Sequence, residues 1–116
     1  MKFSQYNINA TLKKNIEGYG LHRPTDIQFK CIKPILDGQD VLAIAQTGTG
    51  KTASFAIPIL DLVVTNKGRS KGIYALILAP THELARQIHQ TFILLGKGMD
   101  AFAVCIYGGV DQKKTN

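Results

Sequence analysis

The sequence predicts an α/β fold in which helices cover both faces of a doubly wound parallel sheet. Three runs, at residues 41–45, 73–79 and 101–107, are apolar nearly throughout and do not alternate between apolar and polar residues. Continuous apolar strands are expected where a parallel sheet is buried on both faces. Segments with helical periodicity separate these runs, which gives the strand–helix–strand–helix–strand order of such a sheet. The length of 116 residues favours one domain.

Four helices are expected, two before the first strand and two between the strands. A small polar residue that can cap a helix precedes three of them, namely Asn9, Thr25 and Thr81. Pro34 lies late in the second expected helix and predicts a kink or an early end there, and Pro58 is an unfavourable interior proline in the third. The expected ranges are residues 10–17, 26–36, 51–64 and 82–95, with Leu12, Ile16, Leu84, Ile88 and Leu95 on the buried sides.

The composition excludes several classes of protein. A hydrophobic content of 45% exceeds that of disordered chains, and the longest uncharged apolar stretch, residues 52–60, is too short to cross a membrane. The first residues are mostly polar and do not form the apolar core of a signal peptide, so a cytoplasmic protein without membrane contact is expected. Cys31 and Cys105 lie far apart and the three histidines are scattered, which favours neither a zinc site nor a redox pair.

The net charge indicates a polyanionic partner. Fourteen Lys and Arg residues against eight Asp and Glu residues give +6 at pH 7. Nucleic acid is the commonest partner of a chain with such an excess of positive charge.

Residues 45–52 carry the clearest chemical signal. They read AQTGTGKT, directly after an expected strand and at the start of an expected helix, which is the context of a phosphate-binding P-loop. The glycines allow backbone N–H groups to approach phosphate oxygens closely. Lys51 can reach the β- and γ-phosphates, and the Thr52 hydroxyl can ligate Mg²⁺, so both are candidate catalytic residues. The predicted nucleotide-binding residues here are Ala45, Gln46, Thr47, Gly48, Thr49, Gly50, Lys51 and Thr52.

Segments on both sides of this loop resemble motifs of the DEAD-box RNA helicases. Alanine in its first position is the P-loop form of that family, and residues 20–28, GLHRPTDIQ, resemble its Q motif, with Phe3 as the isolated upstream aromatic. Residues 80–87, PTHELARQ, differ by one residue from motif Ia, and residues 108–109 match the GG element. The chain is therefore identified as similar to the N-terminal portion of the first RecA-like domain, with the Q motif over residues 3–28.

This resemblance implies unwinding or remodelling of RNA driven by ATP with Mg²⁺. It adds Leu21, Arg23 and Gln28 as residues that bind the adenine nucleotide. A carboxamide both donates and accepts, so Gln28 can pair with the N6 and N7 edge of adenine and discriminate against guanine. The implied RNA-binding residues are Pro80, Thr81, His82, Gly108 and Gly109.

Two residues depart from the family pattern. Leu21 stands where the Q motif usually has an aromatic residue, and loss of base stacking weakens adenine binding by about 1 kcal/mol. His82 stands where motif Ia usually has arginine, and a histidine is mostly neutral at pH 7. The RNA contact at His82 is therefore expected to be weaker and favoured by acid.

The 116 residues contain no Asp-Glu-Ala-Asp tetrad, which would hold Mg²⁺ and orient the attacking water, and no second RecA-like domain. The sheet is then expected to be incomplete at its C-terminal end, with apolar edges exposed. An alternative is therefore a nucleotide-binding fragment that by itself has neither ATPase nor helicase activity. A small-molecule kinase with a P-loop is a third possibility, but it leaves the Q-motif-like and motif-Ia-like segments unexplained.

Overall fold

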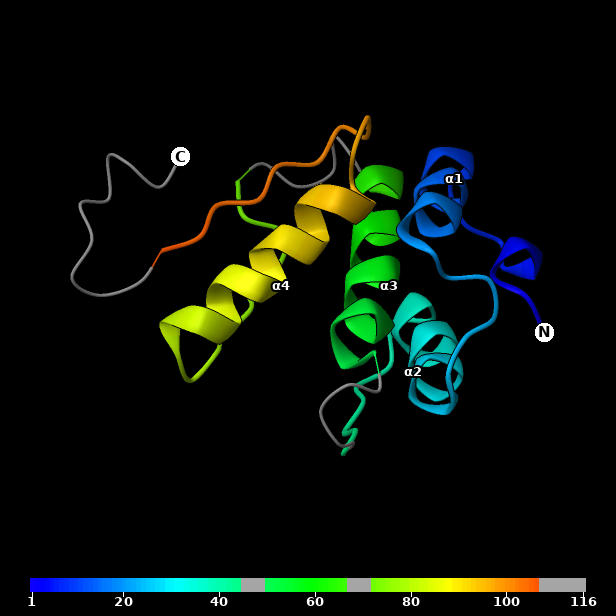
Figure 1. Cartoon of the computed structure of the whole chain (residues 1–116), viewed down its shortest axis with the longest axis horizontal. Helices are drawn as coiled ribbons and strands as arrows, with labels where there is room; N and C mark the ends of the chain where they lie inside the picture. The colour runs from blue at the N-terminus through cyan, green and yellow to red at the C-terminus, as the bar shows by residue number, and fades with distance from the viewer. Residues whose placement is uncertain (45–49, 67–71, 107–116) are drawn as a thin grey trace.

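The structure is a computed structural model that describes residues 1–44, 50–66 and 72–106, and these residues form one short 3₁₀ helix and four α-helices. The helix α3 lies in the middle of the arrangement and packs against α2 on one side and α4 on the other, while α1 contacts both α3 and α4 (Figure 1). The elements are η1 (Phe3–Gln5), α1 (Ala10–Tyr19), α2 (Asp26–Leu36), α3 (Lys51–Thr65) and α4 (His82–Leu95).

Capping residues set the starts of three helices, as the sequence predicts. The Asn9 side chain accepts from the backbone N–H groups of Thr11 and Leu12 at 2.8 and 3.2 Å. Thr25 caps α2, and the Thr81 hydroxyl accepts from the backbone N–H of Leu84 at 3.1 Å. These side chains satisfy N–H groups that have no partner within the helix.

The ends of the helices differ slightly from the prediction. The first helix continues through Gly18 and ends at Gly20, whose φ of 99° is a conformation that glycine adopts easily. Pro58 does not end its helix, and α3 runs from Lys51 to Thr65, one residue beyond the predicted end. Pro58 is fully buried in α3, so packing of its ring offsets the backbone hydrogen bond that proline cannot donate.

The core lies where the four α-helices meet. Leu12 and Ile16 of α1, Ile57 of α3 and Leu95 of α4 are fully buried, as the periodicity predicts for three of them. Leu84 was expected on the buried side of α4, and this expectation is wrong: Leu84 lies in the first turn of the helix and is 37% exposed. Ile88, one turn further, is partly buried against the core.

Two side chains connect α1 to distant parts of the chain. The amide of Asn15 donates to the carbonyl oxygens of Leu95 and Lys97 at 2.8 and 2.7 Å, at the C-terminal end of α4. The carboxylate of the buried Asp61 on α3 accepts from the backbone N–H of Asn9 at 2.8 Å. The start and the middle of α1 are thus fixed to α3 and α4 by hydrogen bonds as well as by apolar packing.

The predicted parallel sheet is not formed in the described residues. Residues 41–44, 73–79 and 101–106 contain no strand, and their main-chain groups make no hydrogen bond to the main chain of another described residue. Apolar composition predicts that a segment will be buried, but a sheet also requires neighbouring strands to form a ladder of main-chain hydrogen bonds. Without that ladder, the described part of the protein is helical.

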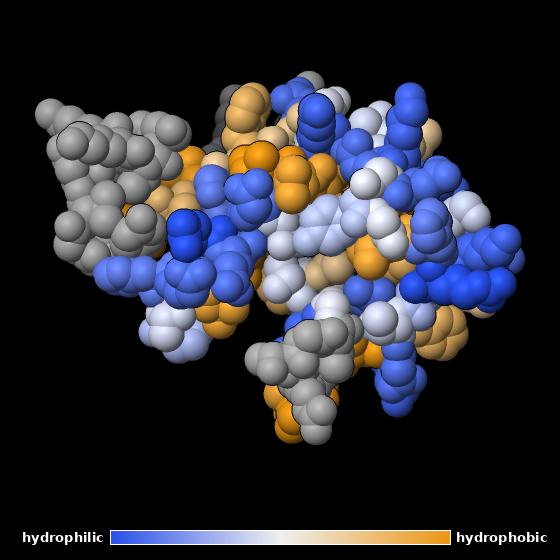
Figure 2. Space-filling view, viewed as in Figure 1, coloured by the Kyte–Doolittle hydropathy of each residue, from blue (hydrophilic) through white to orange (hydrophobic). Residues whose placement is uncertain are grey.

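The large apolar side chains of these segments are consequently exposed. Leu42 is 92% exposed, Leu78 is 84% exposed and Phe102 is 93% exposed. Within residues 101–106, the odd positions are half-buried against the helices and the even positions are exposed, which is the alternation expected of a strand with one covered face. Figure 2 shows orange, hydrophobic patches between blue, hydrophilic regions on one face of the molecule. Among the described residues, no helix has the length and apolar character required to cross a bilayer.

Candidate functional site

The start of α3 differs from the starts of the other three α-helices. Its N-cap is Gly50, which has a φ of 80° and no side chain to accept from the first N–H groups of the helix. An uncapped helix N-terminus combines free N–H groups with the positive end of the helix dipole, which together favour an anion. Ala45, Gln46, Thr47, Gly48 and Thr49, which the sequence predicts to bind nucleotide, lie outside the described residues.

The two candidate catalytic residues are the first residues of α3. The side chain of Lys51 is exposed and forms no ion pair with a described residue. Thr52 is half-buried, and its hydroxyl likewise has no hydrogen-bond partner in the described ranges. A cation and a hydroxyl group are thus both available beside the uncapped end of α3.

Gln28 connects the Q-motif-like segment to this helix start. Its side-chain oxygen accepts from the backbone N–H of Thr25 at 2.9 Å, and its amide nitrogen donates to the carbonyl oxygen of Gly50 at 3.3 Å. The Thr25 hydroxyl accepts in turn from the backbone N–H of Gln28 at 3.4 Å, which completes a capping box. The structure therefore brings together two of the segments that the sequence predicts to share a site.

A side chain at position 50 would displace Gln28 and strain the backbone, whose φ is 80°. A Cβ atom built on Gly50 would lie 2.3 Å from Nε2 of Gln28, closer than nonbonded atoms approach. Gln28 itself is buried, with 1% of its surface exposed. The bonds of the Gln28 amide to Thr25 and Gly50 use one of its two N–H groups and one of its two lone pairs. Recognition of adenine by the remaining N–H group and lone pair stays a prediction.

Leu21 and Arg23 lie in the segment between α1 and α2. Leu21 is partly buried and packs against the core, and its backbone N–H donates to the carbonyl oxygen of Ile16 at 3.1 Å. Arg23 is exposed. The predicted nucleotide contacts of both residues stay predictions.

The predicted RNA-binding residues lie at the start of α4. Pro80, Thr81 and His82 are all exposed, and in Figure 1 the N-terminal ends of α3 and α4 lie toward the same, lower side of the molecule. Gly108 and Gly109 lie outside the described residues.

Glu83 has a local role in α4. Its carboxylate accepts from Arg86 at 2.8 Å and from Gln87 at 3.2 Å. The hydrogen bond from Arg86, the bond from Gln87 and the positive charge of Arg86 lower the pKa of Glu83 below its ordinary value. These contacts stabilise the first two turns of the helix, where a negative charge is also favoured by the helix dipole.

Sequence reasoning identified Thr25 as a cap but missed its reciprocal bond with Gln28. The pattern Thr-x-x-Gln at residues 25–28, directly before an apolar stretch, is the sequence signature of that capping box. The bond from Gln28 to Gly50 had no signal in the sequence, because it depends on how α2 packs against α3.

The chain belongs to the DEAD/DEAH box helicase family, whose sequence model matches residues 25–116. Among relatives, it is 48% identical over 110 residues to the ATP-dependent rRNA helicase RRP3 of Meyerozyma guilliermondii and 45% identical over 110 residues to RRP3 of Saccharomyces cerevisiae. These alignments cover 95% of this chain and 22% and 21% of the two relatives. The chain thus spans about a fifth of the length of these relatives.

Solved structures of the same family are similar to this fold. A DEAD box protein from the hyperthermophile Methanococcus jannaschii matches with a TM-score of 0.88 and 39% identity, over 97% of this chain and 30% of that one. The RNA helicase Prp28 from Chaetomium thermophilum, bound to ADP, matches with a TM-score of 0.85 and 32% identity, over 96% of this chain and 28% of that one. The path of this chain is therefore that of part of a DEAD-box helicase domain.

Proposed function

We propose that this chain is the ATP-binding part of a DEAD-box RNA helicase that unwinds or remodels RNA. Membership of the family and the likeness to relatives named ATP-dependent rRNA helicases support this proposal. The observation that carries it is the bond between Gln28 and Gly50, because it joins the predicted base-reading residue to the start of the predicted phosphate-binding helix. Structured RNA, ribosomal RNA included, is the proposed substrate class.

The phosphates would lie at the uncapped start of α3. There the N–H groups and the helix dipole favour negative charge, and the ammonium group of the exposed Lys51 can approach the β- and γ-phosphates. The Thr52 hydroxyl fits Mg²⁺, which takes oxygen ligands and usually keeps several waters beside one or two protein groups and the phosphates. Bound there, Mg²⁺ would neutralise charge on the phosphate oxygens.

Adenine would be read by Gln28 without breaking its connection to Gly50. The second N–H and the second lone pair of its amide match the N7 acceptor and the N6 donor of adenine, whereas guanine presents an acceptor where adenine has the N6 donor. Leu21 and Arg23 would contribute apolar and charged contacts beside the base. The residue that recognises the base would then be hydrogen-bonded to the start of α3, the helix that holds the phosphates.

RNA phosphates would lie against the start of α4, where Pro80, Thr81 and His82 are exposed, with Gly108 and Gly109 as further contacts. The charge of +6 supports a polyanionic partner. The RecA-like parallel sheet predicted for residues 41–45, 73–79 and 101–107 belongs to the same proposal. It is supported by the alternating exposure of residues 101–106 and by the TM-scores with the family's solved structures.

Calorimetry with ATP, ADP and GTP in the presence of Mg²⁺ tests the nucleotide site. We expect the chain to bind ATP and ADP at least about tenfold more tightly than GTP, a difference of about 1.4 kcal/mol. Lys51→Ala should abolish binding, whereas Lys14→Ala, which removes an exposed lysine on α1, should not change it. Equal affinities for ATP and GTP, or unchanged binding by Lys51→Ala, would contradict the proposal.

The RNA contact is tested separately by comparing the RNA affinity of wild type with that of His82→Arg. His82→Arg should bind RNA more tightly, because the guanidinium group is always charged and its planar fork matches a phosphate. If the two proteins bind RNA equally well, His82 does not contact the RNA backbone.

A further inference from the structure

The side chain of His89 on α4 holds the segment of residues 101–106 through a hydrogen bond. Its Nε2 atom lies 3.0 Å from the carbonyl oxygen of Ala103. A carbonyl oxygen only accepts, so Nε2 carries a proton and donates to it. The main-chain groups of residues 101–106 make no hydrogen bond to the main chain of another described residue. The bond from His89 is therefore a polar contact that fixes this segment to a helix.

Apolar burial does not explain which side of this segment faces the helices. The half-buried side chains are the smaller ones, Ala101, Ala103 and Cys105, and the exposed ones are Phe102, Val104 and Ile106. A shift of one residue would turn the larger side chains inward, and burial of apolar surface favours that shift. The bond from His89 opposes it, because a shift of about 3.3 Å carries the carbonyl oxygen of Ala103 away from Nε2.

The segment returns along α4 toward the start of that helix. In Figure 1 residues 101–106, drawn in orange, run in the direction opposite to α4, and Ala101 and Ala103 pack against the core. His82 and His89 lie seven residues apart, which places them on the same side of α4. That interval spans about 10 Å of helix, and the three residues from Ala103 to Ile106 span about 10 Å of extended chain. Ile106 is therefore expected at the level of His82.

We propose that His89 is a positioning residue for RNA binding, because its bond to Ala103 sets the register in which residues 101–106 pass the start of α4. This inference rests on the proposed function, in which RNA phosphates contact the start of α4 and also Gly108 and Gly109. These two glycines closely follow Ile106 in the sequence and lie outside the described residues. A shift of one residue, about 3.3 Å, exceeds the range over which a hydrogen bond to a phosphate oxygen forms.

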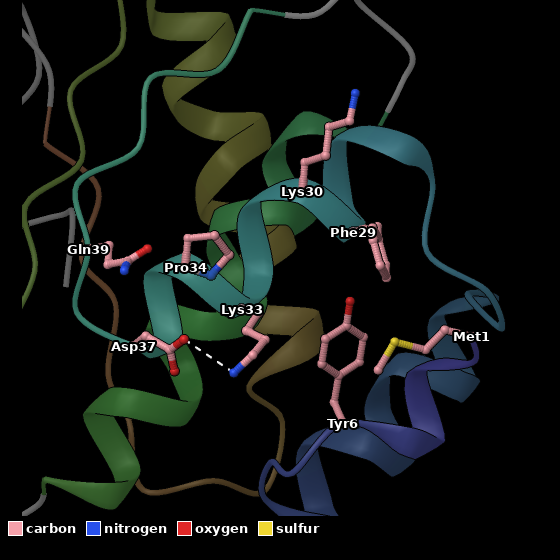
Figure 3. A pocket seen from close by; sticks show the side chains of 8 residues that line it. All are labelled: Met1, Tyr6, Phe29, Lys30, Lys33, Pro34, Asp37 and Gln39. Atoms are coloured by element: carbon pink, nitrogen blue, oxygen red, sulfur yellow. Dashed lines mark hydrogen bonds and ion pairs between the residues drawn. The ribbon is translucent and has the colours of Figure 1, made fainter.

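The pocket between the N-terminal segment and α2 does not provide another RNA site. Figure 3 shows its lining, in which Lys33 of α2 pairs with Asp37 at 3.2 Å. Lys30 likewise pairs with Asp26 at 3.0 Å. The two lysines are balanced by two aspartates, so the rim carries no net charge and an RNA probe is not expected to bind there.

Two substitutions at His89 separate the hydrogen bond from the filling of space. The amide nitrogen of glutamine is separated from the backbone by the same number of bonds as Nε2 of histidine, so His89→Gln keeps a donor. His89→Met has a side chain of the same length without an N–H group, so it removes the donor. Gln90→Met is the matched control, since it introduces the same side chain at the neighbouring, exposed residue of α4.

The register is measured by labelling the two cysteines with N-ethylmaleimide and quantifying each by mass spectrometry. Cys105 is half-buried and would turn outward in the shifted register, where its thiol reacts faster. We expect Cys105 to react about three- to tenfold faster in His89→Met than in wild type, the factor that corresponds to one lost hydrogen bond. His89→Gln and Gln90→Met should react like wild type. The buried Cys31 should react equally slowly in all four proteins, which shows that the helices stay folded.

RNA binding is measured by fluorescence anisotropy with a labelled oligouridylate as the probe. His89→Met should bind it about three- to tenfold more weakly than wild type, and His89→Gln should restore the wild-type affinity. Binding of ATP, measured by calorimetry, should be the same in all four proteins, because His89 does not contact the start of α3.

Several results would overturn the inference. An unchanged rate at Cys105 in His89→Met would mean that the bond does not set the register, and an unchanged RNA affinity would mean that the register does not matter for RNA. Equal losses in His89→Met and His89→Gln would assign the effect to the imidazole ring instead of its N–H group. Faster labelling of Cys31 in His89→Met would assign it to general unfolding. A wild-type chain that binds no RNA would contradict the proposed function itself, so the two failures are distinguishable.

Discussion

Replacement of Gly50 by alanine tests the connection between α2 and the candidate phosphate site. The added Cβ atom would lie 2.3 Å from Nε2 of Gln28, so the Gln28 side chain has to move. Moving it breaks the bonds to Gly50 and Thr25, each worth about 0.5–1.5 kcal/mol. The φ of 80° adds about 1–2 kcal/mol for any residue with a Cβ atom. The free energy of unfolding should therefore fall by about 2–5 kcal/mol.

Gly20→Ala is the matched control. Gly20 has a φ of 99°, but a Cβ atom there would meet nothing within 4 Å among the described residues. This substitution should lower the free energy of unfolding by only the conformational term, about 1–2 kcal/mol. The free energy of unfolding should fall further in Gly50→Ala than in Gly20→Ala. The difference between these two losses measures the cost of displacing the Gln28 side chain.

Urea unfolding of Gly50→Ala, Gln28→Ala and the double variant completes the test. Gln28→Ala removes the obstructing side chain, so Gly50→Ala in that background should be no more destabilising than Gly20→Ala. The effects at positions 28 and 50 should thus be clearly non-additive. If they add within about 0.3–0.5 kcal/mol, the two residues do not interact and the reasoning is wrong.

Three further predictions concern other contacts. Asn15→Ala should lower the free energy of unfolding by about 1–3 kcal/mol in urea, because two carbonyl groups at the end of α4 lose their donor. The pKa of Glu83, followed by NMR, should lie below its ordinary value and rise toward it in Arg86→Ala. Since a lowered pKa stabilises the fold above the unfolded pKa, this contribution should be lost as pH falls below about 4.5. In the 116-residue chain, Phe92→Ala should cost about 3–5 kcal/mol because Phe92 is 8% exposed, whereas Phe102→Ala, at 93% exposed, should change stability by less than about 0.5 kcal/mol.

Each of these has a clear contrary result. Asn7 is an exposed asparagine near α1, so an equal effect of Asn7→Ala would remove the role assigned to Asn15. A pKa of Glu83 that is unchanged by Arg86→Ala would contradict the ion pair. Equal effects at the two phenylalanines would mean that the exposed segment is covered in solution.

The helices were predictable because their signals are local. Asn9, Thr25 and Thr81 each bond to N–H groups within the next few residues, and the apolar spacing of Leu12 and Ile16 identifies the buried side of α1. Leu84 has the correct spacing but is exposed, whereas Phe92 and Leu95 near the other end of α4 are buried, and spacing alone does not show where along a helix burial ends.

The sheet and the tertiary contacts of the site were not predictable in the same way. Apolar runs indicate strands, but pairing depends on main-chain partners far along the sequence, and residues 73–79 have none among the described residues. The P-loop pattern located Lys51 and Thr52 correctly at the start of a helix. The bond from Gln28 to Gly50 emerges only from the packing of α2 on α3.

The bonds of Asn15 to the carbonyl groups of Leu95 and Lys97 bear on the order of events during synthesis. The first helix lies at the start of the chain, yet its polar partners are 80 and 82 residues away. At a synthesis rate of about 5–20 residues per second, α1 waits about 4–16 s before those partners exist. During that interval the apolar side of α1 has only part of its final environment, and a chaperone that binds nascent chains would find it accessible.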